Sequence, residues 1–356
     1  MLAGLKQIFS SLRPSSSAAK QPALLQDGKL HSAKVDSTVP VTEQYNIKQA
    51  PPLNLKALGD TYYRQLVGVT SLHHSPLNAQ EREVLSLIEA LIKSQKQSAS
   101  LIPRMPGVIP KLMTYLRADD YNSKNIAKLI STDPVLVAEV LRLINSPYFR
   151  TAAHSNDLDQ AVFQLGHAGL RELIMSVALK PIMKFDKGYI HQDAAENISA
   201  LSQKAAVACR CLATAANIDP FDAYVAGLLH NTGAMVVLRQ LNQIPQPLEV
   251  TRSKNFQHAT IKYATQLSFL IAEQWGLTEP VIAALKEQIG NHRIRPCSNL
   301  GQVLELGIRI AQLHTLVASG QYESPDYILD ILAQQSFGSD SVRAYNELET
   351  AEKLAS

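Results

Sequence analysis

Apolar residues recur every three to four positions in successive segments of this chain, a spacing that places them on one face of a helix. The first such run is Val84, Leu85, Leu87, Ile88, Leu91 and Ile92. Asn78 and Glu81 precede it with the spacing of a capping box, which marks a helix start. No segment shows the period-two alternation of a strand. The pattern therefore predicts an all-α protein, a bundle of roughly a dozen helices.

Helix boundaries can also be placed from local signals. Asp133-Pro134 and Asp219-Pro220 each combine an N-cap residue with proline at the first helical position. A helix starting at Asp157 is expected to stop at Gly166. Two faces are predicted to point inward, formed by Val137, Val140, Leu141 and Ile144, and by Leu158, Ala161, Val162 and Leu165. The remaining predicted helices cover about 195–216, a segment ending near 230, and about 233–242, 257–275, 278–289, 299–317 and 324–335.

The N-terminal segment differs from the rest in composition. Residues 1–50 are rich in Ser, Gln, Ala, Pro and Lys and have no durable period, so we expect a disordered arm. Residues 51–97 then form a helical preface. The arm carries six Lys/Arg against three Asp/Glu, whereas residues 51–356 are balanced at 28 against 28. A neutral globular part is not typical of a general nucleic-acid binder, so nucleic acid is not an expected partner. A regulator binding nucleic acid through the arm would show steep salt dependence.

Targeting and redox signals are sparse. No apolar run approaches the length of a transmembrane helix, and the first ten residues lack a sustained hydrophobic region with a cleavage site. We therefore expect a cytoplasmic protein, with a short amphipathic anchor over residues 2–12 as the alternative.

Cys209, Cys211 and Cys297 have no zinc-site spacing and are interpreted as buried, reduced thiols.

The most informative motif is an apolar helix that ends in Leu228-Leu229-His230-Asn231-Thr232-Gly233. HD phosphohydrolases present their metal-binding His-Asp pair at the end of a similar helix. Here Asn231 stands where the aspartate would be, and a neutral amide cannot bridge two cations as a carboxylate can. The central question is therefore whether this protein is an enzyme.

Six blocks in the same order resemble the HDOD family, a bacterial relative of the HD and HD-GYP phosphohydrolases. They are Ile102–Pro106, Ile130–Leu136, Val140–Tyr148, Leu158–Gly166, Gly227–Gly233 and Trp275–Pro280. The resemblance implies an HDOD domain over about 98–295, with one helical half at 98–190 and a degenerate HD-like half from 191. Residues 296–356 would then add C-terminal helices that complete the HD-like half.

The same resemblance indicates which positions would hold metal ligands in a hydrolase. They correspond here to Leu201, His230, Asn231, Ala264 and Gln288, with His292 as an alternative if a loop is three residues longer. Leucine and alanine have no donor atom, and one histidine cannot assemble a site that activates water. We therefore expect no metal, no cofactor and no catalytic residue. His230 is interpreted as a residue of a lost site that is hydrogen-bonded at a helix end, and Asn231 as a cap of the next helix.

A second group of polar residues could act in binding. Arg142 and Asn145 are three positions apart on one helix face, and Ser146 follows immediately. Pro147 ends the helix, so Asn145 is first read as a helix stop that holds the following loop. The functional alternative is a patch of Arg142, Asn145, Ser146 and His292 for a ligand or partner.

Two function classes follow. The first is a non-catalytic HDOD regulatory module of signal transduction that binds a signalling protein or a small ligand in a cleft between its halves, near His230. The second is a divergent metal-dependent phosphohydrolase acting on a nucleotide, such as a cyclic dinucleotide. The missing ligands favour the first.

Overall fold

The computed structural model describes residues 55–67, 72–93, 123–132, 134–145, 158–183, 192–242, 253–290, 298–322, 330–334 and 337–353. The predicted arm at 1–50, Cys297 and most of the predicted helix at 324–335 lie outside these residues. Within the described part, the regular structure is helical apart from one isolated bridge between His73 and Ser253. The all-α prediction is confirmed.

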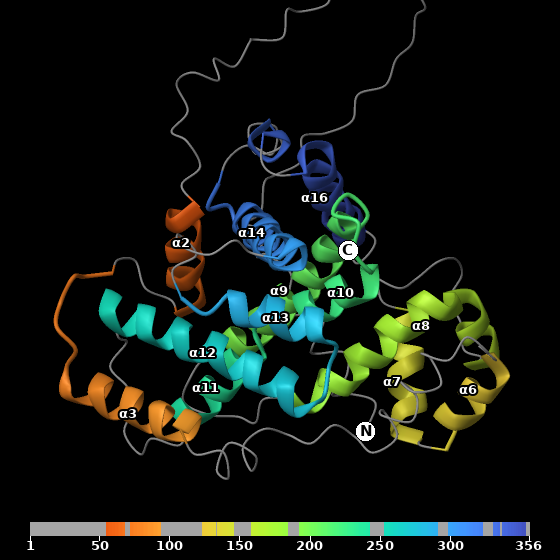
Figure 1. Cartoon of the computed structure of the whole chain (residues 1–356), viewed down its shortest axis with the longest axis horizontal. Coiled ribbons are helices and arrows are strands. Elements are labelled where there is room, and N and C mark those ends of the chain that lie inside the picture. Colours follow the sequence, from red (N-terminus) through yellow and green to blue (C-terminus); the bar gives the residue numbers. More distant parts are fainter. Residues whose placement is uncertain are drawn as a thin grey trace, which may run out of the picture. The chain divides into compact units, whose positions relative to one another are not determined.

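The described part of the chain contains twelve helices of eight or more residues (Figure 1), besides a short helical segment at 330–333. They are α2 (Leu55–Val67), α3 (Ala79–Lys93), α6 (Ser123–Ile130), α7 (Pro134–Ile144), α8 (Leu158–Met183), α9 (Gln192–Ala213), α10 (Pro220–Leu229), α11 (Thr232–Asn242), α12 (Lys254–Gln274), α13 (Glu279–Glu287), α14 (Asn299–Ala318) and α16 (Gly338–Lys353). The two short helices α10 and α11, which flank His230, lie in the chain between the long helices α9 and α12, and the short α13 lies between α12 and the long α14.

The helix starts follow the local signals in the sequence. Asn78 and Glu81 form a reciprocal capping box, in which each backbone N–H donates to the other side chain, at 2.9 and 2.7 Å. The Asp219 carboxylate accepts from the Phe221 N–H at 2.9 Å, with Pro220 at the first helical position of α10. Proline also opens α7. These two helices begin where the Asp-Pro pairs predicted.

Gly166 separates two helical segments within α8. Its φ of 61° and ψ of −172° break the helical geometry inside α8, and a second helical segment continues to Met183. The first helical segment therefore stops at Gly166, as predicted, and the second follows it directly across a kink. The helix after it was missed, although Leu170, Leu173, Ile174 and Val177 repeat at helical spacing and are buried.

Helix α9 is the centre of the core. It packs on α10, α14 and α16, and its small residues Ala205, Ala206, Ala208 and Cys209 are fully buried. A Cβ added to Gly227 of α10 would come within 2.7 Å of the Ala205 carbonyl oxygen. On α14, a Cβ at Gly307 would collide with the Cys209 sulfur. Small residues therefore let these helices approach each other closely.

The preface helices belong to the same packed unit. Tyr62 of α2 donates to the Asn197 carbonyl of α9 at 3.4 Å, and Gln257 of α12 donates to Asp60 at 3.0 Å. Helix α3 packs on α12. In α3, Val84, Leu85 and Ile88 are buried as predicted. Leu87 is 50% exposed, so its assignment to the inward face was wrong.

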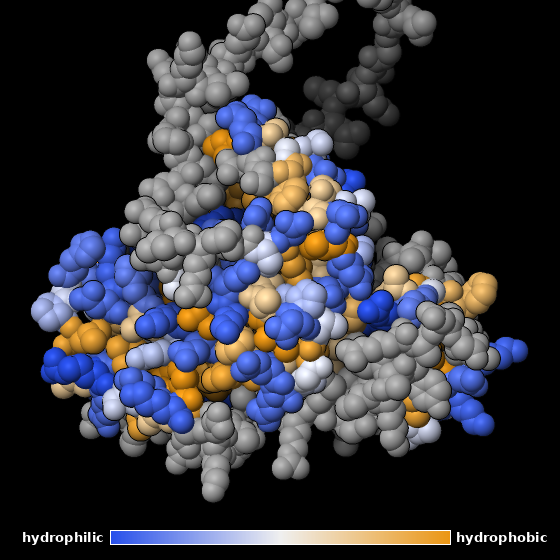
Figure 2. Space-filling view, viewed as in Figure 1, coloured by the Kyte–Doolittle hydropathy of each residue, from blue (hydrophilic) through white to orange (hydrophobic). Residues whose placement is uncertain are grey.

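The described surface carries both polar and apolar residues (Figure 2). Figure 2 shows hydrophilic and hydrophobic side chains interspersed on one face of the protein. None of the helices in the described part is both long and apolar enough to cross a membrane.

Cys209 is buried and Cys211 is partly exposed. Both are free thiols, and burial raises the pKa of each.

Candidate functional site at the His230 turn

His230 caps the C-terminus of α10 and begins the two-residue turn into α11. Its Nδ1 lies 2.6 Å from the Gly227 carbonyl oxygen. A carbonyl oxygen can only accept, so the imidazole proton resides on Nδ1 and Nε2 carries the lone pair. The interpretation of His230 as a histidine hydrogen-bonded at a helix end is confirmed.

The Nε2 atom of His230 is buried and has no hydrogen-bond partner among the described residues. Burial lowers the pKa of His230 to about 4, and the Gly227 hydrogen bond opposes that shift only in part. The ring is therefore neutral at neutral pH. A neutral imidazole with an unused lone pair can accept a hydrogen bond or bind a metal.

Ser268 of α12 fixes the position of the turn. Its hydroxyl donates to the His230 carbonyl at 2.8 Å and accepts the Gly233 N–H at 2.9 Å. Gly233 also lies directly against the α12 backbone. A Cβ at this position would collide with the Ala264 carbonyl oxygen and come within 2.7 Å of the Ser268 nitrogen. The turn and α12 are therefore packed backbone to backbone.

Asn231 precedes the first residue of α11, as predicted for a cap position. Its carbonyl accepts from the N–H groups of Ala234 at 3.0 Å and Met235 at 3.4 Å. Thr232 is fully buried and its hydroxyl donates back to the Leu229 carbonyl at 2.8 Å. The two helices are thus joined by hydrogen bonds on both sides of the turn.

The other positions suggested by the resemblance are structural. Leu201 is buried in α9, one turn before Ala205, which lies against Gly227. Ala264 packs partly buried on the core and, through its carbonyl, lies beside Gly233. Gln288 follows α13, and its amide nitrogen donates to the carbonyls of Ala284 and Gly301, both at 3.1 Å. Gln288 therefore ties α13 to α14.

The structure brings the His230 turn and Ala264 together, but it shows no ligand set around them. In the described part of the chain, no group of three or more His, Cys, Asp or Glu side chains is arranged to hold a metal ion. His292, the alternative ligand, lies outside the described residues.

The predicted polar patch is only partly described. Helix α7 ends at Ile144, which confirms the helix stop, and the Asn145 amide donates back to the Leu141 carbonyl at 2.7 Å. The loop that Asn145 was predicted to hold lies outside the described residues. Arg142 is exposed on α7. Ser146 and His292 lie outside the described residues, so the patch stays a prediction.

Sequence reasoning missed two features. No local sequence signal marks Ser268, because it lies within the long α12 and has no motif of its own. A buried cluster around His314 was also missed, although a histidine in the apolar run of α14 is a signal that could have been followed.

The comparisons with known proteins agree with this geometry. The HDOD domain family matches residues 102–289. An uncharacterized protein of Treponema pallidum (strain Nichols) is 28% identical over 223 residues, which cover 56% of this chain and 41% of that protein. The match thus spans less than half of the curated relative.

Two solved structures share the fold. One is a "putative metal-dependent phosphohydrolase" from Shewanella amazonensis, with a TM-score of 0.55 and 17% identity over 78% of this chain and all of that one. The other is an HDOD domain protein of unknown function from Geobacter sulfurreducens, with a TM-score of 0.50 and 20% identity over 77% and 94% of the two chains. With the family match over more than half of its length, this chain belongs to the HDOD domain family.

Proposed function

We propose that this protein is a non-catalytic regulatory module of signal transduction that acts by binding a protein or a small ligand. The observation that carries the proposal is the chemistry around His230. By the resemblance to the HD families, Leu201 and Ala264 correspond to positions where a hydrolase would have histidines. Neither side chain has a donor atom in any protonation state, so two ligands are lost outright.

The other two of these positions that the structure describes, Asn231 and Gln288, do not compensate for this loss. Asn231 and Gln288 are neutral amides rather than histidine or carboxylate ligands, and the amide nitrogen of Gln288 holds the side chain on the carbonyls of Ala284 and Gly301. Metal-assisted hydrolysis needs a cation that lowers the pKa of water and polarises the phosphate, and such a cation needs several converging ligands. His230 alone supplies one.

The ordered geometry of the His230 turn suits the binding of a ligand or partner. The His230 ring is fixed by the Gly227 carbonyl, and the turn is fixed by Ser268. The lone pair on the buried Nε2 of His230 can accept a hydrogen bond from an N–H or O–H group of a ligand or partner. A rigid acceptor of this kind loses little conformational entropy when it binds. The cleft expected between the two halves stays a prediction.

The second candidate is a divergent metal-dependent phosphohydrolase acting on a nucleotide. The specific observation in its favour is again the free Nε2 of His230, which has the protonation state of a metal ligand. One histidine would have to combine with ligands from outside the described residues, such as His292.

A phosphodiesterase assay separates the two candidates. Full-length protein would be incubated with bis(p-nitrophenyl) phosphate or a cyclic dinucleotide in the presence of Mn²⁺, Fe²⁺ or Mg²⁺. We expect the wild-type rate to equal that of His230→Ala, because the ligand set is incomplete. Metal-dependent turnover that disappears in His230→Ala but persists in His258→Ala, an exposed histidine of α12, would contradict the proposal.

A further inference from the structure

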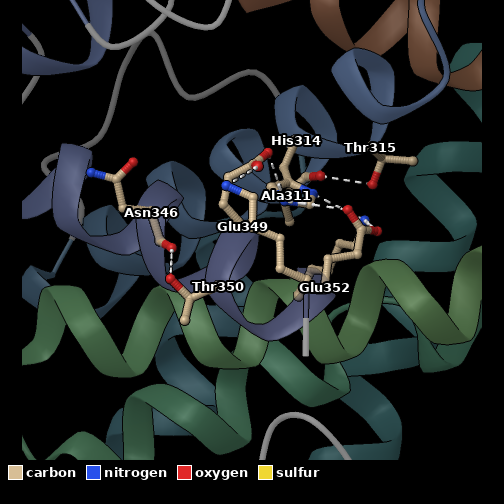
Figure 3. A network of polar contacts seen from close by, with 9 residues as sticks. Ala311, His314, Thr315, Asn346, Glu349, Thr350 and Glu352 are labelled. Atoms are coloured by element: carbon tan, nitrogen blue, oxygen red, sulfur yellow. Dashed lines mark hydrogen bonds and ion pairs between the residues drawn. The ribbon is translucent and has the colours of Figure 1, made fainter. Parts of the chain in front are cut away.

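A buried cluster of ionisable groups lies at the junction of three helices, separate from the His230 turn. Lys204 comes from α9, His314 from α14, and Tyr345, Glu349 and Glu352 from α16. Figure 3 shows His314, Glu349 and Glu352 pointing toward one another between α14 and α16. His314 and Tyr345 are almost fully buried, and Lys204 is only 7% exposed. Helices α14 and α16 lie beyond the residues that match the family.

The hydrogen bonds define the protonation state of His314. Lys204 Nζ lies 3.0 Å from His314 Nδ1 and 3.1 Å from Glu352 Oε1. An ammonium group can only donate, so Nδ1 must be the unprotonated nitrogen of a neutral ring. The ring proton is then on Nε2, which faces Glu349 Oε1 at 3.4 Å and Glu352 Oε2 at 3.8 Å. Lys204 thus donates to the ring and to Glu352, and joins α9 to both α14 and α16.

Adding a proton to His314 is incompatible with this arrangement. An imidazolium carries hydrogens on both nitrogens, so Nδ1 could no longer accept from Lys204. Two cations would then face each other across 3.0 Å in a buried place. Burial lowers the pKa of His314 to about 4, and Lys204 contributes to this shift, while Glu352 opposes it. Neutral His314 is therefore the state that the folded arrangement selects.

The groups facing His314 come from two other helices. Lys204 faces it from α9, and Tyr345, Glu349 and Glu352 face it from α16. Burial raises the pKa of Tyr345 to about 12, so its ring, 5.3 Å from that of His314, stays a neutral phenol. Helices α2, α10 and α13 also pack on α14, but their described residues include no hydrogen-bond or ion-pair partner of His314.

We infer that this cluster is a proton-sensitive latch, in which neutral His314 lets Lys204 hold α16 on the core and protonated His314 releases α16. Helix α16 is the helix that moves away from the core, because α9 and α14 are closely packed where Gly307 contacts Cys209. The two carboxylates of α16 are 34% and 47% exposed, so they lie at the edge of the core. When Lys204 is displaced, its bond to Glu352 is lost with it.

The direction of the pH effect follows from linkage. With α16 released, His314 regains an ordinary pKa near 6.5, whereas with α16 docked it stays near 4. The released form therefore binds more protons between these values, and docking weakens as the pH falls from about 6.5 toward 4. Above that window docking does not depend on His314.

Hydrogen exchange on the full-length protein tests the latch. Protection factors, corrected for the intrinsic exchange rate, would be compared at about pH 7.5 and about pH 5. We expect peptides of α16 to lose protection by about tenfold at the lower pH, while peptides of α13, which contains no histidine, change much less. Equal protection of α16 at both pH values would overturn the inference.

Two variants assign the effect to the cluster. In His314→Gln the amide oxygen can still accept from Lys204 but does not titrate, so α16 should stay protected at both pH values. In Lys204→Gln the amide can still donate to Nδ1 but carries no charge, so the acid-induced loss should shrink. This second variant keeps the test decisive if the first fails to fold. An undiminished loss of α16 protection in either folded variant would contradict the latch.

Discussion

Replacing Gly233 with alanine is expected to lower the free energy of unfolding by about 3 kcal/mol, because a Cβ cannot fit against α12. The added atom would collide with the Ala264 carbonyl oxygen and approach the Ser268 nitrogen and Leu267 Cβ within 2.8 Å. These are mostly backbone atoms, so relief requires α11 and α12 to move apart. That movement also breaks the bonds of Ser268 to the turn. Urea unfolding followed by circular dichroism measures the loss.

Gly59→Ala is the matched control for this substitution. Gly59 lies inside α2, and a Cβ there would meet nothing within 4 Å. Alanine favours the helix by about 0.5–1 kcal/mol over glycine, so this variant should be slightly more stable than the wild type. If Gly233→Ala proved as stable as Gly59→Ala, the backbone contact between the turn and α12 would be disproved.

Replacing Arg210 with alanine is expected to cost about 3–5 kcal/mol, because it leaves a buried carboxylate unpaired. Arg210 of α9 donates to Glu172 of α8 at 2.8 Å, and Glu172 is only 4% exposed. Burial already raises the pKa of Glu172, although Arg210 opposes the shift. The same unfolding experiment measures this loss.

The pH dependence of Arg210→Ala provides a check with a defined sign. Without the guanidinium, the pKa of Glu172 should rise further above its unfolded value. Such a group contributes stability at low pH and loses it as the pH rises through the folded pKa. The loss in free energy of unfolding caused by Arg210→Ala should therefore be larger at pH 8 than at pH 5.

Two further variants separate charge from packing at Arg210. Converting the pair together, as Arg210→Met with Glu172→Leu, should restore most of the stability because no charge is left buried. Lys93→Ala, at the exposed ion pair with Glu89, should have no measurable effect. The double variant could instead lose as much free energy of unfolding as Arg210→Ala. That result would show that packing, and not the buried charge, accounts for the loss.

Helix starts could be read from the sequence because their signals are local. The capping box at Asn78 and Glu81 and the Asp219-Pro220 start act within one turn, and the structure reproduces both. The kink at Gly166 shows the limit of such signals. A glycine with positive φ marks a break in the helix, but whether another helix follows depends on packing farther along the chain.

The candidate site was predictable where it depends on one turn. The hydrogen bond of His230 to its own helix and the position of Asn231 before α11 follow from the helix-end motif. The contact of Gly233 with Ala264 joins two helices whose contact no short pattern encodes. In the cluster, Lys204 is more than a hundred residues from both His314 and Glu352 along the chain, so only the folded chain reveals it.

The metal content of the purified, untagged protein tests the central claim most directly. The protein would be expressed with Mn, Fe, Zn and Mg supplied, and its metals would be quantified by elemental mass spectrometry. We predict a stoichiometry near zero for both the wild type and His230→Ala, because Leu201 and Ala264 have no donor atom and Asn231 is a neutral amide. One or more tightly held metal ions per chain, lost in His230→Ala and retained in His258→Ala, would contradict the non-catalytic account.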